Sequence, residues 1–341
     1  MSQKVFGIDF GTQSLKIYKK NHGLLLHEKS IVAINSREKT AIAVGDEAFS
    51  MYEKAPASIQ VSFPLVHGVV AQMEDMIALW NYAFGEIAAA SKMKSAEFYI
   101  AVPCDITEVE KRAFYDVLVE SKLKIKKAVL VDKPIADAIG AGIDINTTAG
   151  AMVVNMGADT TEISIISLGG IVISKLLPIG GNSIDKAIRL SLSNKEHFSI
   201  GYKTAEATKI NFAERYQPDS VFEVKGMNVV NGLPETHTVS GQLVYPFLEE
   251  YLVAVSEVIK TTLERTPPEI STDIIEDGVY LTGGGAFICT AARALEERTG
   301  LQMHPCKNAA TTVVDGLGKI IEQPKYASYY LEKHGSMTIT K

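Results

Sequence analysis

Two short motifs with the same layout lie half a chain apart. The first reads Asp9-Phe-Gly11-Thr12 and the second Asn155-Met-Gly157-Ala158, so the offset from residue 9 to residue 155 is 146 residues. Each motif follows a strand-like apolar run and predicts a tight hairpin turn, because glycine tolerates the backbone geometry of such turns. A duplicated domain with a cleft between its copies would produce this repeat. The length of 341 residues also suits about two domains.

Composition excludes several classes of protein. The formal net charge is -6, which argues against nucleic acid as the main partner, because phosphate binding needs a basic face. No apolar run approaches the roughly 18 residues of a membrane span, and the start Met-Ser-Gln-Lys lacks the pattern of a signal peptide. Three cysteines are an odd count without paired spacing. We therefore expect a cytoplasmic protein without a disulfide framework or a Cys-rich zinc site.

Strand-like and helix-like segments recur in both halves. Residues 4–34 alternate in strand fashion, and the apolar spacing of residues 73–90 predicts a helix. Asp105 and Glu108 form a capping signal for a helix that runs to about Glu120. An Ala/Gly-rich helix is expected at 135–142, with a close neighbour packed against it. Further strands are expected at 151–155, 162–167, 171–177 and 279–282, and a long helix at 243–264. This mixture predicts an α/β fold with two mixed sheets, each flanked by helices.

Three glycine-bearing turns are candidates for phosphate or nucleotide contact. In the hairpins, Gly11 and Gly157 let backbone N–H groups approach an anion. Asp9 could hold Mg²⁺ through water, because this ion prefers carboxylates and keeps much of its hydration shell. The third turn, Gly283-Gly284-Gly285, removes every Cβ where a ring or ribose could lie, although it matches neither a Walker A nor a G-x-G-x-x-G pattern. Taken singly, each turn is also explained by an ordinary hairpin or a flexible loop.

These turns belong to a series of motifs that runs from about residue 5 to residue 320. The series comprises Phe6-Gly-Ile-Asp-Phe-Gly-Thr12, Val102-Pro103, Ile106-Thr-Glu-Val-Glu-Lys-Arg112, Ala138-Ile-Gly-Ala-Gly142, Thr160-Thr-Glu-Ile163, Ile166-Ser-Leu-Gly-Gly-Ile171, Thr204-Ala-Glu206 with Lys209, Thr261-Thr-Leu-Glu-Arg-Thr-Pro-Pro-Glu269 and Leu281-Thr-Gly-Gly-Gly285. In this series the chain resembles the actin-like ATPase superfamily and, within it, the bacterial cytoskeletal MreB family. The order of the motifs is more specific than any one of them.

The resemblance implies an actin-like fold of two related domains around a nucleotide cleft. Domain I would comprise residues 1–144 and 317–341 with a small subdomain at about 33–65, and domain II residues 145–316 with a small subdomain at about 182–245. The implied cofactors are ATP and Mg²⁺, with Asp9 and Asn155 near the metal through water. The residues implied to contact the nucleotide are Gly11, Thr12, Gln13, Lys16, Gly157, Ala158, Asp159, Thr160, Glu206, Lys209, Gly283, Gly284 and Gly285. Glu206 and Lys209 lie one helical turn apart, near the base or ribose, although an intrahelical salt bridge also explains the pair.

Two segments depart from the pattern of the family. The Ala/Gly-rich helix is usually entered by Glu-Pro, and that Glu orients the attacking water, whereas here the segment reads Asp132-Lys133-Pro134. A charged lysine cannot accept a proton, so hydrolysis is expected to be slow. Lys133 would instead pair with Asp159 or with a γ-phosphate oxygen. The alternative is that Lys133 faces solvent and another residue orients the water. The candidate catalytic positions are Lys133, Asp132 and Thr160.

The second departure lies in the second hairpin, which carries Asn155, Ala158 and Asp159 where the family has an Asp followed by glycines. Asn155 removes a negative charge that would help to order the waters of the metal. Asp159 adds a negative charge near the phosphates. Both changes are expected to weaken catalysis more than binding.

Function and partners follow from the same resemblance. It implies a filament-forming cytoskeletal protein for cell shape, or for helicity and motility, whose partners are other copies of itself and other MreB paralogues. Lys92 and Lys94 in the loop at 90–95, and a Tyr/Lys tail at 326–333, are candidates for contact with an anionic membrane surface, although a solvated loop and a frayed terminus explain them equally well. A small-molecule kinase on the same fold is the alternative function. A chaperone of the superfamily would need a peptide-binding domain after the nucleotide domain.

Overall fold

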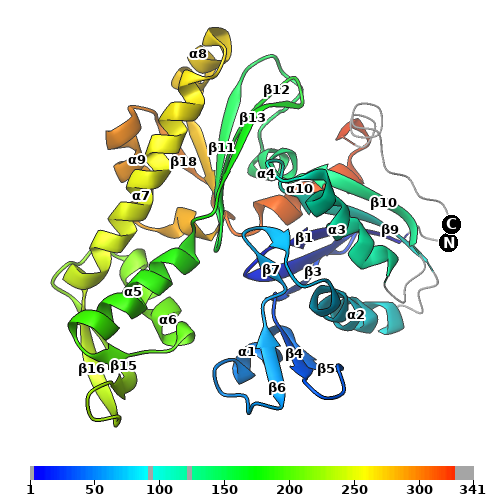
Figure 1. Cartoon of the computed structure of the whole chain (residues 1–341). Helices are drawn as coiled ribbons and strands as arrows, with labels where there is room; N and C mark the ends of the chain where they lie inside the picture. The colour runs from blue at the N-terminus through cyan, green and yellow to red at the C-terminus, as the bar shows by residue number, and fades with distance from the viewer. Residues whose placement is uncertain (1–3, 91–94, 121–124, 327–341) are drawn as a thin grey trace. The chain divides into compact units, whose positions relative to one another are not determined.

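The computed structural model describes residues 4–90, 95–120 and 125–326. The chain divides into two compact units (Figure 1). Unit 1 comprises Met1–Ala149, Ser164–Leu176 and Ala310–Lys341, and unit 2 comprises Gly150–Ile163 and Leu177–Ala309. Within the described ranges, no helix is both long enough and apolar enough to cross a membrane.

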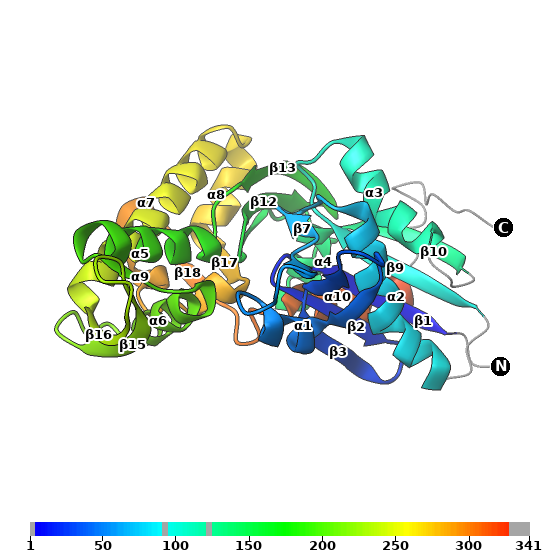
Figure 2. The same ribbon diagram turned by 60° about the horizontal axis from the view of Figure 1, so that its bottom comes forward.

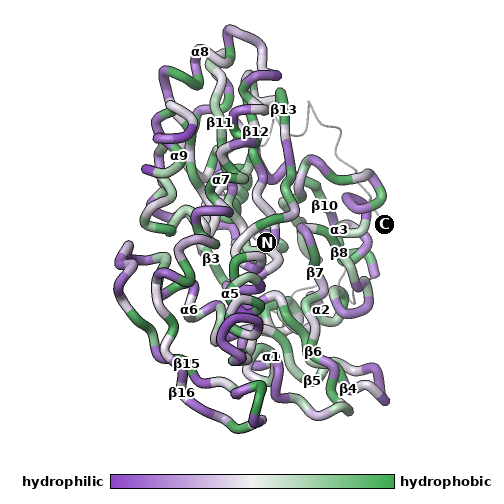
Figure 3. The backbone as a smooth tube through the Cα atoms, turned by 60° about the vertical axis from the view of Figure 1, so that its left-hand side comes forward, coloured by the Kyte–Doolittle hydropathy of each residue, from purple (hydrophilic) through white to green (hydrophobic). Residues whose placement is uncertain are grey.

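The main sheet of unit 1 has five strands in the order β10-β9-β1-β2-β3. Strand β1 runs parallel to β9 and antiparallel to β2, with which it forms the first hairpin. Successive side chains of a strand point to opposite faces. The strands are β1 (Val5–Phe10), β2 (Ser14–Lys19), β3 (Gly23–Lys29), β9 (Ala96–Val102) and β10 (Ile125–Asp132). Figure 3 shows the apolar stretch of β10 in green.

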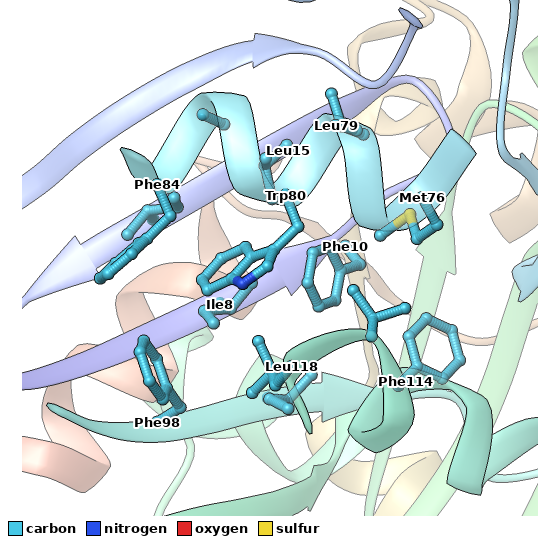
Figure 4. Close-up of a cluster of buried hydrophobic side chains, with 14 of the residues drawn as sticks. Ile8, Phe10, Leu15, Met76, Leu79, Trp80, Phe84, Phe98, Phe114 and Leu118 are labelled. Carbon is cyan, nitrogen blue, oxygen red and sulfur yellow. The ribbon is translucent and has the colours of Figure 1, made fainter. Parts of the chain in front are cut away.

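One face of this sheet carries the aromatic core of unit 1. Phe6, Ile8 and Phe10 of β1 point to this face, where α2 (Met73–Ala90) and α3 (Glu108–Val119) cover them. Figure 4 shows Trp80 of α2 beside Ile8 and Phe10. The Trp80 ring stacks on Phe84 with the ring centroids 4.7 Å apart, and both side chains are fully buried. Helix α2 matches the predicted helix because its apolar residues recur at helical spacing.

The opposite face of the sheet packs against α4 (Lys133–Ala141) and α10 (Thr312–Glu322). A Cβ on Gly7 of β1 would lie 2.8 Å from the Leu317 Cβ of α10. The two helices approach so closely that a Cβ on Gly140 would lie 1.8 Å from the Thr312 carbonyl oxygen, and one on Gly316 would lie 1.7 Å from the Ala136 carbonyl oxygen. The close neighbour that the Ala/Gly-rich sequence of α4 predicts is therefore confirmed.

The cap of helix α3 lies two residues later than the sequence predicts. Thr107, and not Asp105, is the N-cap: its hydroxyl accepts from the Glu110 N–H, while the Glu110 carboxylate accepts from the Thr107 N–H. Asp105 instead accepts from the Leu176 N–H and pairs with Lys175. The prediction of Asp105 as the capping residue is therefore wrong. Thr-x-x-Glu is the better capping box, because both orphan donors are satisfied reciprocally.

The rest of unit 1 is built from short elements. A second sheet in the order β5-β4-β6 packs with α1, and β7 pairs with β8. These elements are β4 (Val32–Asn35), β5 (Ala41–Val44), α1 (Gly45–Met51), β6 (Ile59–Ser62), β7 (Leu65–Val66) and β8 (Val69–Val70).

Unit 2 centres on β11 and β17 of a five-stranded sheet in the order β13-β12-β11-β17-β18, whose strands β12 and β13 continue into unit 1. Helix α5 lies beside α6, next to a small sheet in the order β14-β15-β16 (Figure 2). The elements are β11 (Ala151–Met156), β12 (Thr161–Ser167), β13 (Gly170–Leu177), α5 (Gly181–Lys195), β14 (Phe198–Ser199), α6 (Tyr202–Glu214), β15 (Val221–Asn228), β16 (Pro234–Ser240), α7 (Gly241–Glu264), α8 (Pro268–Asp277), β17 (Val279–Thr282), η1 (Gly284–Phe287), α9 (Ala291–Thr299) and β18 (Met303–Pro305).

Candidate functional site

The first hairpin turn is held by a backbone hydrogen bond of its own and by two hydrogen bonds from Ser30. The Gly11 N–H donates to the Ser14 carbonyl oxygen at 3.1 Å, and a Cβ on Gly11 would lie only 2.7 Å from that oxygen. Ser30, which follows β3, donates its hydroxyl to the Gly11 carbonyl at 2.6 Å and its N–H to the Gln13 carbonyl at 3.1 Å. Glycine is thus required at position 11, and the loop Gly11–Gln13 is held in one shape.

The second hairpin turn repeats this geometry in unit 2. The Gly157 N–H donates to the Thr160 carbonyl oxygen at 2.9 Å, and a Cβ on Gly157 would again lie 2.7 Å from that oxygen. Asp9 and Asn155 occupy matching positions, each two residues before the required glycine and each buried. The sequence repeat therefore corresponds to a repeat in backbone structure.

Asp9 and Lys16 form a buried ion pair on the first hairpin. They face each other across β1 and β2, with Lys16 Nζ 3.1 Å from Asp9 Oδ2 and both side chains less than a tenth exposed. Burial alone would raise the pKa of Asp9. The charges of Lys16 and Lys133, with the hydrogen bond from Lys16, outweigh burial and lower the pKa of Asp9 below its ordinary value. Asp9 is therefore ionised at neutral pH.

Lys133 opens helix α4, and its positive charge acts on Asp9 within unit 1. Pro134 follows it in the first turn, where the missing N–H of proline costs nothing. Asp132 is the N-cap by position, yet its side chain makes no capping hydrogen bond to α4. The structure thus brings Asp9, Lys16 and Lys133 together, while the pairing of Lys133 with Asp159 stays a prediction.

In unit 2, the glycine triplet packs against the end of the strand that leads into the second hairpin. A Cβ on Gly283 would lie 2.5 Å from the Met156 carbonyl oxygen, and one on Gly285 would lie 2.7 Å from the Met156 Cβ. Gly283 also has a φ of +75°, which favours glycine. At Gly284 an added Cβ would meet nothing within 4 Å, so the open backbone surface lies at the middle glycine.

Lys209 reaches the same region from helix α6. Its ammonium lies 3.1 Å from the Gly181 carbonyl oxygen and 2.8 Å from Asp185 Oδ2 of α5. Gly181 in turn donates its N–H to the Gly157 carbonyl oxygen of the second hairpin at 3.1 Å. Lys209 therefore forms its ion pair with another helix, while Glu206 is partly exposed on α6. The second hairpin, the triplet and Lys209 form one contiguous region of unit 2.

Sequence reasoning missed three residues of this region. Gly180 would place a Cβ 2.6 Å from the Gly157 carbonyl oxygen, and Asn182 donates its N–H to the Ala158 carbonyl oxygen at 2.6 Å. Asp185, which is fully buried, is the partner of Lys209. The sequence feature that could have identified Gly180 and Asn182 is the Gly180-Gly181 pair at the start of a helix, where close backbone packing is common. The spacing of Asp185 from Lys209 carries no signal, because the two helices meet only in the fold.

The residues present fit a magnesium nucleotide in their donor chemistry. Asp9 is an ionised carboxylate, and Mg²⁺ that keeps most of its water needs only one or two such groups. Over the part of the chain that the structure describes, His, Cys, Asp and Glu do not gather in threes as a dehydrated metal site would require. The membrane candidates Lys92 and Lys94, and the tail beyond Tyr326, lie outside the described residues.

The paired hairpins and the two units define an actin-like protein, and solved structures support this class. The chain matches MreB5 of Spiroplasma citri bound to ADP with a TM-score of 0.88 and 29% identity, over 96% of this chain and 98% of that one. A further structure of MreB5 is bound to AMPPNP. This chain also matches the fold of a MamK double helical filament with a TM-score of 0.76 and 20% identity, over 94% of this chain and 99% of the MamK chain.

Sequence comparison narrows the class to one family. A family model described as MreB/Mbl protein matches residues 3–328. The cell shape-determining protein Mbl of Bacillus subtilis (strain 168) is 34% identical over 325 residues, covering 94% of this chain and 97% of Mbl. The chain therefore belongs to the MreB/Mbl family of actin-like cytoskeletal proteins.

Proposed function

We propose that this chain binds ATP with Mg²⁺ and polymerises into filaments that organise cell shape, or helicity and motility, and that it hydrolyses ATP slowly. Support for nucleotide binding comes from the similar MreB5 structures, which contain ADP and AMPPNP. Support for self-association comes from the MamK filament, which shares the fold. A cytoplasmic location, and contact with an anionic face of the cell membrane or with other MreB paralogues, belong to the same proposal.

Each candidate residue has a role that its chemistry allows. The turns Gly11–Gln13 and Gly157–Thr160 receive the phosphates, and their peptide N–H groups beyond Gly11 and Gly157 bind phosphate oxygens. The Gly11 and Gly157 N–H groups themselves close the hairpins. Lys16 adds a positive charge, and Asp9 orders the waters of Mg²⁺ with weaker help from the neutral Asn155. The base and ribose lie over Gly284, where the backbone is open, close to Glu206 and Lys209.

The observation that carries slow hydrolysis is Lys133 at the start of α4, acting on Asp9. A cation at this position cannot take a proton from water, and its charge adds to that of Lys16 in keeping the Asp9 carboxylate ionised. A water-orienting group contributes roughly 10²–10⁴ in rate, so a chain without one keeps ATP bound for longer. Slow turnover and retained binding would favour the ATP-bound state.

Phosphate release under Mg-ATP tests this proposal. Lys133→Glu should raise the rate at least about tenfold over the original chain, since it supplies an acceptor for water. Lys133→Met should leave the rate low, because it removes the charge without adding an acceptor. Lys225→Glu, at an exposed position on β15, is the charge-matched control and should not change the rate. Rapid release by the original chain, or an unchanged rate in Lys133→Glu, would contradict slow hydrolysis.

Filament formation is tested separately by sedimentation and electron microscopy of the purified chain with Mg-ATP, Mg-ADP and no nucleotide. Filaments that depend on nucleotide are expected. The alternative function, a small-molecule kinase, predicts monomers that transfer phosphate to a metabolite. Binding of vesicles rich in anionic lipid, compared between the original chain and Lys92→Glu/Lys94→Glu, tests the membrane contact.

A further inference from the structure

A buried pair of hydroxyl groups, to which the proposed function assigns no role, lies next to the second hairpin. Thr161 directly follows the hairpin and is fully buried, and Tyr251 from the middle of α7 is 5% exposed. The Thr161 Oγ1 and the Tyr251 hydroxyl oxygen are 2.8 Å apart. Thr161 Oγ1 also lies 2.9 Å from the Ile179 carbonyl oxygen.

The direction of these hydrogen bonds follows from counting hydrogens. Thr161 has one hydroxyl hydrogen, and only a donor can satisfy the Ile179 carbonyl, so this hydrogen points to Ile179. Tyr251 must therefore donate its own hydrogen to Thr161 Oγ1. Burial raises the pKa of Tyr251 above its ordinary value, which keeps the phenol protonated and able to donate.

Thr161 thereby connects three segments that surround the hairpin. Ile179 immediately precedes Gly180-Gly181, and the Gly181 N–H donates to Gly157 while the Asn182 N–H donates to Ala158. The glycine contacts leave no free space between these segments, because a Cβ on Gly180 would overlap Gly157 and Ala158. Any shift of Thr161 is therefore passed to both the hairpin and the start of α5.

We propose that the Tyr251 hydroxyl is a positioning group: it holds Thr161, and through Thr161 the second hairpin, in the arrangement that receives the phosphates of ATP. This inference rests on the proposed function, since it assumes that the hairpin binds phosphate. In this proposal, α7 supports the second hairpin through the hydrogen bond from Tyr251 to Thr161. A change in phosphate contact at the hairpin would therefore alter the position of α7.

The experiment measures the affinity of the full chain for Mg-ATP and for adenosine in parallel. Tyr251→Phe should weaken Mg-ATP binding about tenfold, the scale of one buried hydrogen bond, and leave adenosine binding unchanged. Thr161→Val should behave in the same way, while Thr161→Ser, which keeps the hydroxyl, should stay within about twofold of the original chain. A merely structural role would instead lower both affinities in step with thermal stability.

Tyr245→Phe is the matched control. Tyr245 lies on the same helix, and its hydroxyl bridges the Arg215 carbonyl and the Gln217 N–H, away from the hairpin. This variant loses a hydroxyl of the same kind and should keep its Mg-ATP affinity. Equal loss of ATP affinity in Tyr245→Phe and Tyr251→Phe would overturn the inference.

Hydrogen exchange of the nucleotide-free chain separates this inference from the proposed function. Tyr251→Phe should speed exchange of the Gly157, Gly181 and Asn182 amides, which carry the hydrogen bonds of this region. Unchanged exchange would overturn the positioning role whatever the nucleotide data show. If the original chain binds neither ATP nor adenosine, the proposed function fails, and with it the phosphate-receiving role of Tyr251.

Discussion

Gly140→Ala tests the close approach of α4 and α10, which positions Lys133. The added Cβ would lie 1.8 Å from the Thr312 carbonyl oxygen, whereas an ordinary C···O contact is about 3.3–3.6 Å. The obstacle is backbone, so one helix must move away by roughly 1.5 Å. Such movement also disturbs the bonds from the Lys319 ammonium to the Ile139 and Gly140 carbonyls.

The magnitude follows from two opposing effects. Overpacking costs about 1–3 kcal/mol or more, and an overlap this deep belongs at the upper end. Alanine is about 1 kcal/mol better than glycine inside a helix, which offsets part of the cost. The net loss is therefore about 2 kcal/mol, or about 4–8 °C in the melting temperature of a unit of this size.

Gly85→Ala supplies the control, and thermal unfolding followed by circular dichroism supplies the assay. Gly85 lies inside α2, and an added Cβ there would meet nothing within 4 Å. Only the propensity effect remains, so this variant should melt about 2–4 °C higher than the original chain. If Gly140→Ala melts at or above the original chain, the geometric argument for α4 and α10 is refuted.

Three further predictions concern unit 1. Lys16→Met should lower the free energy of unfolding by about 3–5 kcal/mol in denaturant titration, because it leaves the buried Asp9 carboxylate without its partner; adding Asp9→Asn should recover most of the loss. Because the folded pKa of Asp9 is lowered, its contribution to stability is present above its unfolded pKa and is lost as the pH falls through the folded value. The difference in the free energy of unfolding between the original chain and Asp9→Asn should therefore become smaller below about pH 4. A difference that does not change with pH would contradict this prediction. Thr107→Ala should cost about 1 kcal/mol through loss of the cap on α3, whereas Thr107→Ser should cost little.

The sequence predicts those features that depend on local pattern. Helix α2 is found at Met73–Ala90 because its apolar residues recur with the period of a helix, and the hairpins are found at Gly11 and Gly157 because the turn demands glycine. The sequence does not decide the cap of α3, because Asp105 and Thr107 each precede a glutamate by three positions. The hydrogen bonds of the fold distinguish the two, because Thr107 and Glu110 form both bonds of a capping box whereas Asp105 accepts from Leu176 of β13.

Features that depend on contacts between distant segments are not readable in this way. The Ala/Gly composition of α4 predicts a close neighbour. That this neighbour includes Gly316 of α10 is known only from the packed helices. Lys209 is placed in a pair with Glu206 by helical spacing, yet its ion pair is made with Asp185 from a neighbouring helix. Likewise, the sequence Gly283–Gly285 suggests an open backbone surface along all three residues. In the structure, Gly283 and Gly285 are required by contact with Met156, and of the three only Gly284 is open.

The two hairpins share the glycines that their backbone geometry requires, but they differ in their charged side chains. Both require glycine for the same reason, since a Cβ would lie 2.7 Å from a carbonyl oxygen three residues on. Their charges differ, because the positions of Asp9 and Lys16 in the first hairpin are taken by Asn155 and the buried Glu162 in the second. Backbone donors can bind phosphate in either hairpin without these side chains. Metal ordering and water activation depend on them. A chain that keeps the glycines and changes the charges is therefore expected to lose hydrolysis before it loses nucleotide binding.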